Sequence, residues 1–379
     1  MSGTYPHVRV AGTPSERGRQ YGSQAADRVG RSVGIYRRIF DHYAGWDWAT
    51  VTTHAREYLP VLEAIHPRYV AEMAGIAEGA GLAFDDILAI NVRTEVMFAA
   101  VARRAAVAEC TSFVALPEAT SDGHTLIGEN WDWKRHMTDT VVVVEAEQDA
   151  GPAYVTVVEA GLLAKAGMNA AGIGLVTNAL ISDRDRGEPG LPYHVILRSI
   201  LDAPNLPAAL DAVTRHHRSS AANYLVASRE GMAVDIEAAP GDHSQVWLSW
   251  PAPDTLVHTN HYTCETGLKD VMRWHTPDSP FRHRRATTLI EAARGRVDAA
   301  SLQTVMRDHV NHPVGVCSHP DPALPELEQD MSVLGVLFDL QTATMWLADG
   351  QPCEHEFRRV EYSSFFGGAA AAGTSGAGR

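Results

Sequence analysis

The chain has 379 residues, with 32 lysines and arginines against 46 aspartates and glutamates, which gives a formal charge of −14. Because no broad basic field is present, this balance argues against partners such as nucleic acid or an anionic membrane surface. A hydrophobic content of 45% is enough to bury a substantial core and excludes an intrinsically disordered chain.

Neither a targeting segment nor a disulfide framework is predicted. Residues 1–22 lack the apolar stretch of a secretory signal, and no uncharged apolar run approaches the roughly 18 residues that span a bilayer. The four cysteines, at positions 110, 264, 317 and 353, follow no repeating spacing. We therefore expect a cytoplasmic protein with reduced thiols.

The first third of the chain has the pattern of helices. Apolar residues recur at three- and four-residue steps from Leu59 to Ile76, which predicts one helix with a buried stripe, ended by the glycines at 79 and 81. The segment from Phe84 to Met97 predicts another helix.

From Cys110 onward the pattern changes to strands. Short apolar runs separated by turn residues predict four hairpins. Their strands are expected at 111–116 with 124–130, 141–146 with 154–159, 163–167 with 172–180, and 223–228 with 233–238. Helices are expected at 193–201, 208–216, 282–294 and 301–309, and the last strands at 333–339 and 344–348.

Short, hairpin-like connections between two helical blocks favour antiparallel sheets covered by helices over a parallel sheet. We find no internal repeat and no linker that would separate two domains. Residues 367–379 are rich in glycine and alanine and are expected to form a disordered tail.

The segment that points to chemistry contains Cys110 and Asp132. A cysteine that opens a strand has its thiol at the end of a sheet, and the hairpin return brings Asp132 back to that end. A carboxylate raises the pKa of a neighbouring thiol rather than lowering it. Its useful role at this place is therefore to hold an ammonium or guanidinium group.

Several motifs together resemble one family. They are Gly12–Gly18, Gly75–Gly81, Glu109-Cys110-Thr111-Ser112-Phe113, Gly128-Glu129-Asn130-Trp131-Asp132, Gly167–Gly172 with Thr177-Asn178, Val257–His261, Ser279-Pro280-Phe281-Arg282 and Pro352–His355. In this order they are similar to the isopenicillin N acyltransferase-like (acyl-coenzyme A:6-aminopenicillanic acid acyltransferase) family. These are autoproteolytic N-terminal-nucleophile (Ntn) cysteine enzymes related to bile salt hydrolases, and the similarity covers roughly residues 9–357.

The resemblance implies an α+β fold, the Ntn-hydrolase four-layer αββα sandwich with two antiparallel sheets. It implies cleavage of the precursor between Glu109 and Cys110. Residues 1–109 would become an α chain and residues 110–366 the catalytic core of a β chain, paired as a heterodimer with higher oligomers possible. It requires no cofactor and no metal, and the expected partner is a small amide or acyl thioester substrate.

The resemblance also implies the site. Cys110 would be the nucleophile, and its freed α-amino group would be the base, since such groups have a pKa of about 7.7–8.0 in unstructured peptides. Asp132 would orient that amino group, Arg282 would pair with Asp132, and Asn260 would donate to the oxyanion. Asn178 is the second oxyanion candidate; Arg284 and Arg285 remain alternatives to Arg282.

Other interpretations stay open at this point. One of Trp131 and Trp133 is expected in the core and the other facing the pocket. The acyl group could pass to water or to an amine. Two further classes are an unprocessed, catalytically silent protein that binds an acyl ligand and a zinc hydrolase. The zinc hydrolase would use the histidines at 258, 261, 309, 312 and 319 with Cys317, although their spacing matches no compact metal motif.

Overall fold

The computed structural model describes residues 4–101 and 110–367. Glu109 and all of the expected tail except its first residue therefore lie outside the described residues. None of the described helices combines the length and the apolar character needed to cross a bilayer.

The first third is helical, as predicted, but it begins with a strand that the pattern did not reveal, β1 (His7–Gly12). The expected helix from Leu59 to Ile76 is two helices, because His66 precedes a proline and has an extended φ of −131°. The helix expected over 84–97 is likewise divided, at Val92. The helices are α1 (Pro14–Gln24), α2 (Ala26–Ala44), α3 (Trp48–Ala55), α4 (Leu59–Ile65), α5 (Pro67–Ala80), α6 (Phe84–Asn91) and α7 (Arg93–Val101).

Helices α1 and α5 pack with their backbones in close approach, and glycines on both helices permit it. A Cβ atom at Gly18 would lie 2.2 Å from the carbonyl oxygen of Glu72, and one at Gly75 would lie 2.5 Å from that of Ser15. The motifs Gly12–Gly18 and Gly75–Gly81, which contribute to the family resemblance, thus contain the glycines that let these two helices pack closely.

We expect Gly18→Ala to lower the free energy of unfolding by about 3 kcal/mol, because the added methyl group meets backbone that cannot move without separating the helices. The matched control is Gly34→Ala on α2, where a Cβ meets nothing within 4 Å. That change should stabilise the helix by about 0.5–1 kcal/mol. Urea denaturation of both variants measures the contrast, and equal effects would contradict this account of the packing.

The larger sheet has eight strands in the order β1-β4-β5-β6-β7-β8-β9-β10. Its strands after β1 are β4 (Val141–Gln148), β5 (Tyr154–Glu159), β6 (Ala166–Asn169), β7 (Ile173–Ala179), β8 (Ala222–Ser228), β9 (Met232–Ala238) and β10 (Val246–Ser249). The three predicted hairpins in this region are confirmed. The sheet departs from the predicted antiparallel pattern at one edge, where β1 pairs with β4 in parallel.

The smaller sheet has six strands in the order β11-β2-β3-β12-β13-β14. They are β11 (Thr255–His258), β2 (Cys110–Ala115), β3 (Leu126–Lys134), β12 (Asp330–Asp339), β13 (Thr344–Ala348) and β14 (Arg358–Glu361). The predicted hairpin of β2 and β3 is confirmed, and it places Cys110 directly opposite Trp131.

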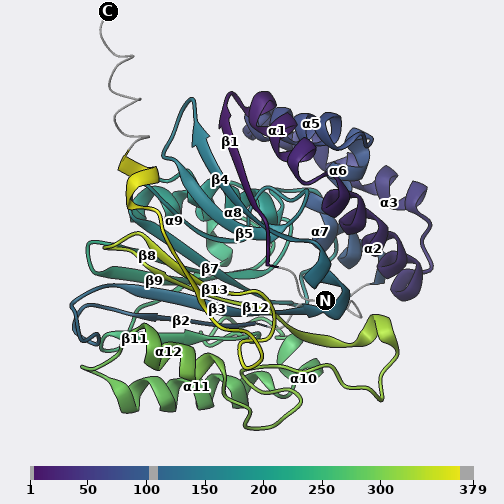
Figure 1. Cartoon of the computed structure of the whole chain (residues 1–379). Coiled ribbons are helices and arrows are strands. Elements are labelled where there is room, and N and C mark those ends of the chain that lie inside the picture. The colour runs from purple at the N-terminus through teal and green to yellow at the C-terminus, as the bar shows by residue number, and fades with distance from the viewer. Residues whose placement is uncertain (1–3, 102–109, 368–379) are drawn as a thin grey trace, which may run out of the picture.

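The two sheets lie face to face, with β2 and β3 against β7. Helices α8 (Tyr193–Leu201) and α9 (Leu206–Thr214) cover the larger sheet, while α11 (Ser279–Ala293) and α12 (Ala299–Met306) cover the smaller one. Figure 1 shows α11 and α12, with the short α10 (Met272–His275), at the bottom, and α1 to α6 beside β1 and β4 at the upper right. The predicted four-layer αββα sandwich is therefore confirmed.

Candidate active site

Cys110 is the first residue of β2, and its side chain is completely buried. Its backbone is held on both sides by residues far along the chain. The Cys110 N–H donates to Asn260 Oδ1 at 2.8 Å, and the Cys110 carbonyl accepts from Arg282 Nη1 at 2.8 Å. Two of the candidate residues thus meet at the candidate nucleophile.

Asn260 and Arg282 are positioned by the ends of two elements. Asn260 follows β11, and its backbone N–H donates to Ser279 Oγ at 2.8 Å, at the start of α11. Arg282, on the first turn of α11, donates from Nη2 to Asn260 Oδ1 at 3.1 Å. The amide of Asn260 therefore presents its oxygen to Cys110, whereas its Nδ2 donates to the Ala179 carbonyl at 3.1 Å.

The three candidate arginines occupy different environments. Arg282 is 1% exposed, and its Nε donates to Asp278 Oδ2 at 2.7 Å. Arg285 pairs with Asp308 at 2.7 Å, and Arg284 is exposed. Of these three arginines, only Arg282 reaches the backbone of Cys110.

Asp132 lies beside Trp131 on β3, on the opposite face of the sheet from the Cys110 side chain. Its Oδ1 accepts a hydrogen bond of 2.5 Å from Ser332 Oγ, and its Oδ2 is buried without a partner among the described residues. Within the described residues the Arg282 guanidinium contacts Asp278, Asn260 and the Cys110 carbonyl, and it makes no ion pair with Asp132. Burial raises the pKa of Asp132 to about 8, against the opposing effect of the Arg282 charge.

Burial also raises the pKa of the Cys110 thiol, to about 12, and the charge of Lys165 opposes this shift. Lys165 is 3% exposed, and its Nζ lies 4.5 Å from the centre of the Trp131 ring. Sequence reasoning did not assign it a role. The available signal was its rarity: the chain has only three lysines, and this one lies within the strand expected at 163–167.

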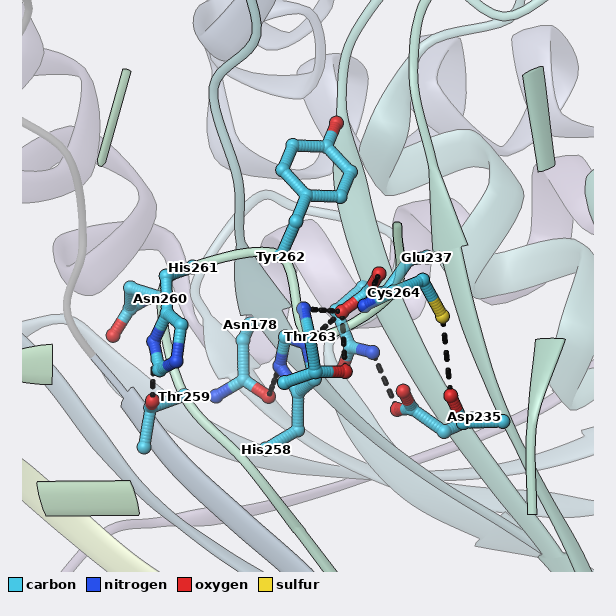
Figure 2. Close-up of polar contacts among 12 residues, drawn as sticks. Asn178, Asp235, Glu237, His258, Thr259, Asn260, His261, Tyr262, Thr263 and Cys264 are labelled. Atoms are coloured by element: carbon cyan, nitrogen blue, oxygen red, sulfur yellow. Dashed lines mark hydrogen bonds and ion pairs between the residues drawn. The ribbon is translucent and has the colours of Figure 1, made fainter. Parts of the chain in front are cut away.

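Asn178 lies on β7, across from the inner face of β2. Its Oδ1 accepts from Ser112 Oγ and lies 3.2 Å from His258 Nδ1, while its Nδ2 is buried without a partner among the described residues. His258 Nε2 in turn lies 2.9 Å from Glu237 Oε1. Figure 2 shows this row of side chains from Asn178 through His258 to Glu237.

The charges along this row favour one orientation of the Asn178 amide. Burial works against a charged His258, but the carboxylates of Asp235 and Glu237 outweigh it and raise its pKa. Burial likewise opposes the Glu237 charge, but hydrogen bonds, first among them that with His258, lower its pKa to about 2. A protonated His258 can only donate from Nδ1, so it holds the Asn178 oxygen and leaves the Asn178 N–H groups for another acceptor.

A small hollow of about 60 Å³ lies near the site, where Ala179 both forms part of its wall and accepts the hydrogen bond from Asn260. Trp133 and Lys165 form part of its wall, whereas Trp131 is fully buried in the core. Of the two tryptophans, only Trp133 lines this hollow, and whether the substrate binds there stays a prediction. The remaining wall is mostly aromatic and aliphatic: Tyr36, Ile39, Phe40, Arg93, Thr94, Met97, Phe98, Ala179, Leu180, Tyr193 and Ala221.

Two facing sheets enclosed by helices, with a cysteine at the start of an inner strand, define the fold class of the Ntn hydrolases. The family model for acyl-coenzyme A:6-aminopenicillanic acid acyl-transferase matches residues 119–353. The chain belongs to this family, as its motifs predicted. Because the matched segment begins after Cys110, the case for that residue depends on the motif and on the geometry around it.

The chain is similar to the 40 kDa form of acyl-coenzyme A:6-aminopenicillanic-acid-acyltransferase of Emericella nidulans, with 28% identity over 314 residues, 82% of this chain and 84% of that protein. Two solved structures also match. A mutant of the conjugated bile acid hydrolase of Clostridium perfringens has a TM-score of 0.45 and 11% identity, over 67% of this chain and 97% of the other. Penicillin V acylase of Agrobacterium tumefaciens has a TM-score of 0.45 and 14% identity, over 66% of this chain and 86% of the other.

Proposed function

We propose that this protein is an Ntn cysteine enzyme that cleaves itself between Glu109 and Cys110 and then transfers an acyl group from an amide or thioester through a Cys110 thioester. The observation that carries the proposal is the way in which Cys110 is held. Its N–H is bound by Asn260, its carbonyl is bound by Arg282, and Asp132 lies on the adjacent strand with a buried oxygen that has no partner among the described residues.

Self-cleavage is an exchange of an amide for a thioester. The Cys110 sulfur attacks the carbonyl carbon of Glu109, the bond to the Cys110 nitrogen breaks, and the thiol proton passes to the released amine. Water then adds to the thioester, frees the Glu109 carboxylate and returns a proton to sulfur. The hydrogen bond from Arg282 to the Cys110 carbonyl holds the backbone on one side of this bond.

The released α-amino group would then be the general base for the same thiol. In the uncleaved chain Asn260 Oδ1 already accepts from the Cys110 nitrogen. The unpartnered Oδ2 of Asp132 is the group we propose to accept a further N–H of the new ammonium. An ammonium beside Asp132 would favour the ionised carboxylate, in the opposite direction to the burial that raises its pKa in the uncleaved chain.

Acyl transfer needs donors for the oxyanion that forms on the substrate carbonyl. Asn178 supports this role because its Nδ2 is buried without a partner among the described residues. Asn260 remains the other candidate through its Nδ2, which donates to Ala179 in the uncleaved chain. The largely apolar hollow beside Trp133 is where we propose that the acyl portion of a small substrate binds. The acceptor, water or an amine, depends on which of them the pocket holds in position to attack.

The primary test is the covalent state of active protein. Intact mass and N-terminal sequencing should show two fragments, one of them beginning at Cys110. Amide substrates, offered with amine and thioester co-substrates, should then be turned over, and the products would distinguish transfer from hydrolysis. A single full-length species in active material would overturn the proposed self-cleavage. A full-length species that binds acyl ligands without turnover would instead support the silent binder.

We expect Asn178→Asp to lower kcat by about 100- to 1000-fold, because the aspartate keeps the acceptor for Ser112 and His258 but loses the N–H donor. Its KM should change little, since the lost interaction belongs to the transition state. Steady-state kinetics measures kcat and KM separately, and far-ultraviolet circular dichroism checks that the variant is folded. A raised KM with unchanged kcat would contradict the assigned role.

A further inference from the structure

The loops at the end of the smaller sheet bring together a second group of reactive side chains. His309, Cys317 and His319 come from the segment between α12 and β12, and Cys353 comes from the turn after β13. Each offers one ligand atom, and the four atoms lie within 4.8 Å of one another. The histidines at 258 and 261 are not part of this group. The histidines that the zinc-hydrolase interpretation grouped together therefore do not form one site.

The separations between these atoms suit a tetrahedral metal ion. With Zn–S bonds of about 2.3 Å and Zn–N bonds of about 2.0–2.1 Å, the ligand atoms of a tetrahedral site are about 3.3–3.8 Å apart. His319 Nε2 lies 3.0 Å from His309 Nε2, 3.8 Å from Cys317 Sγ and 3.4 Å from Cys353 Sγ. Two imidazoles and two thiolates are also a common donor set of structural zinc sites.

Hydrogen bonds from neighbouring residues hold two of these four side chains in place. The backbone N–H of Cys353 donates to the Cys317 sulfur and so ties the two cysteines together. The other ring nitrogen of His319, Nδ1, lies 2.7 Å from Gln351 Nε2, and this contact holds the ring with its Nε2 turned to the group. Cys317 is completely buried, whereas His309 is exposed, so an ion could enter from the His309 side.

We propose that His309, Cys317, His319 and Cys353 bind one zinc ion with a structural role. Four protein ligands fill a tetrahedral coordination sphere and leave no position for an activated water, so the site does not hydrolyse substrate. The ion would join the turn at Cys353 to the loop that carries Cys317 and His319. The proposal does not depend on the chemistry of Cys110.

The proposed zinc ion would also affect the geometry of the active site. Ser318, between two of the ligands, donates its N–H to Ser332 Oγ at 2.9 Å, and the same hydroxyl donates to Asp132 Oδ1. A metal that fixes the loop therefore also fixes the hydroxyl that holds the Asp132 carboxylate.

The test is metal analysis of tag-free, full-length protein purified without chelator. One zinc per chain is expected by elemental analysis. Replacement by Co²⁺ should give the intense visible bands of tetrahedral cobalt and thiolate-to-cobalt charge-transfer absorption in the near ultraviolet. Removal of the metal should lower the melting temperature, and added zinc should restore it.

Two variants and one control identify the ligands. Cys317→Ser and Cys353→Ser should each weaken zinc binding by more than about 100-fold, the upper end for loss of an outer-shell partner, and abolish the charge-transfer band. Cys264→Ser is the control, because Cys264 contacts Ser249 elsewhere in the fold. Protein that binds no zinc after incubation with it would overturn the proposal. So would a mass two hydrogens lower with Cys317 disulfide-bonded to Cys353, or equal binding in both ligand variants and the control.

Discussion

Cys110→Ala should give a single full-length chain with no acyl transfer activity. The alanine has no sulfur to attack the Glu109 carbonyl, so no free α-amino group forms, and no nucleophile remains for a substrate. Loss of a covalent nucleophile typically costs about 10⁶-fold in kcat, so turnover should be at background. Denaturing gels, intact mass and product assays on the same preparation measure both effects.

Two further cysteine variants separate this chemistry from general damage. Cys264→Ala removes a half-buried thiol that contacts Ser249, and it should leave cleavage and turnover unchanged. Cys110→Ser keeps a weaker nucleophile and should cleave slowly. If the Cys110→Ala chain still breaks at the same bond and turns over substrate, the assignment of the nucleophile is wrong.

Asp132→Asn, made in the uncleaved Cys110→Ala chain, should raise the free energy of unfolding, and the gain should grow with pH. Burial raises the Asp132 pKa from 3.8 to about 8 in the folded state. Between these values the unfolded chain binds fewer protons at this group than the folded chain, so its contribution to stability falls as the pH rises. Asparagine removes that penalty and keeps an oxygen for the Ser332 hydroxyl.

The gain should be larger at pH 8.5 than at pH 5.5 by about 3 kcal/mol, measured by urea denaturation at both values. Asp139→Asn is the control, because Asp139 is exposed and its replacement should give the same small effect at both pH values. In the native background Asp132→Asn should also slow turnover, since the α-amino group loses its proposed carboxylate partner. A gain that does not depend on pH would show that the Asp132 carboxyl is not the titrating group.

The pattern of apolar and turn residues within short stretches of the sequence was sufficient to predict much of the secondary structure. The hairpin expected from 223–228 and 233–238 is observed as Ala222–Ser228 paired with Met232–Ala238. Both strands of such a pair are specified by alternation and by a turn of a few residues, all within one stretch of chain. Long-range pairing was not accessible in this way. The parallel pairing of His7–Gly12 with a strand more than 130 residues away has no local signature.

The break between α4 and α5 is a second feature that the apolar pattern did not predict. Apolar periodicity continued from Leu59 to Ile76 because α4 and α5 bury neighbouring faces, and only Pro67 marked the break. The apolar pattern by itself therefore does not reveal where one helix ends and the next begins.

Local pattern was enough to predict the family, many of the helices and strands from Leu59 onward, and the small set of side chains around which the chemistry can be proposed. Tertiary structure alone decided which arginine reaches the Cys110 carbonyl, which atom of the Asn260 amide faces the Cys110 nitrogen, and that Lys165 lies beside Trp131. It also decided that Cys353 meets Cys317 and His319. The physical reason is that motifs record local backbone requirements, whereas these contacts join residues up to 172 positions apart and depend on how whole layers pack.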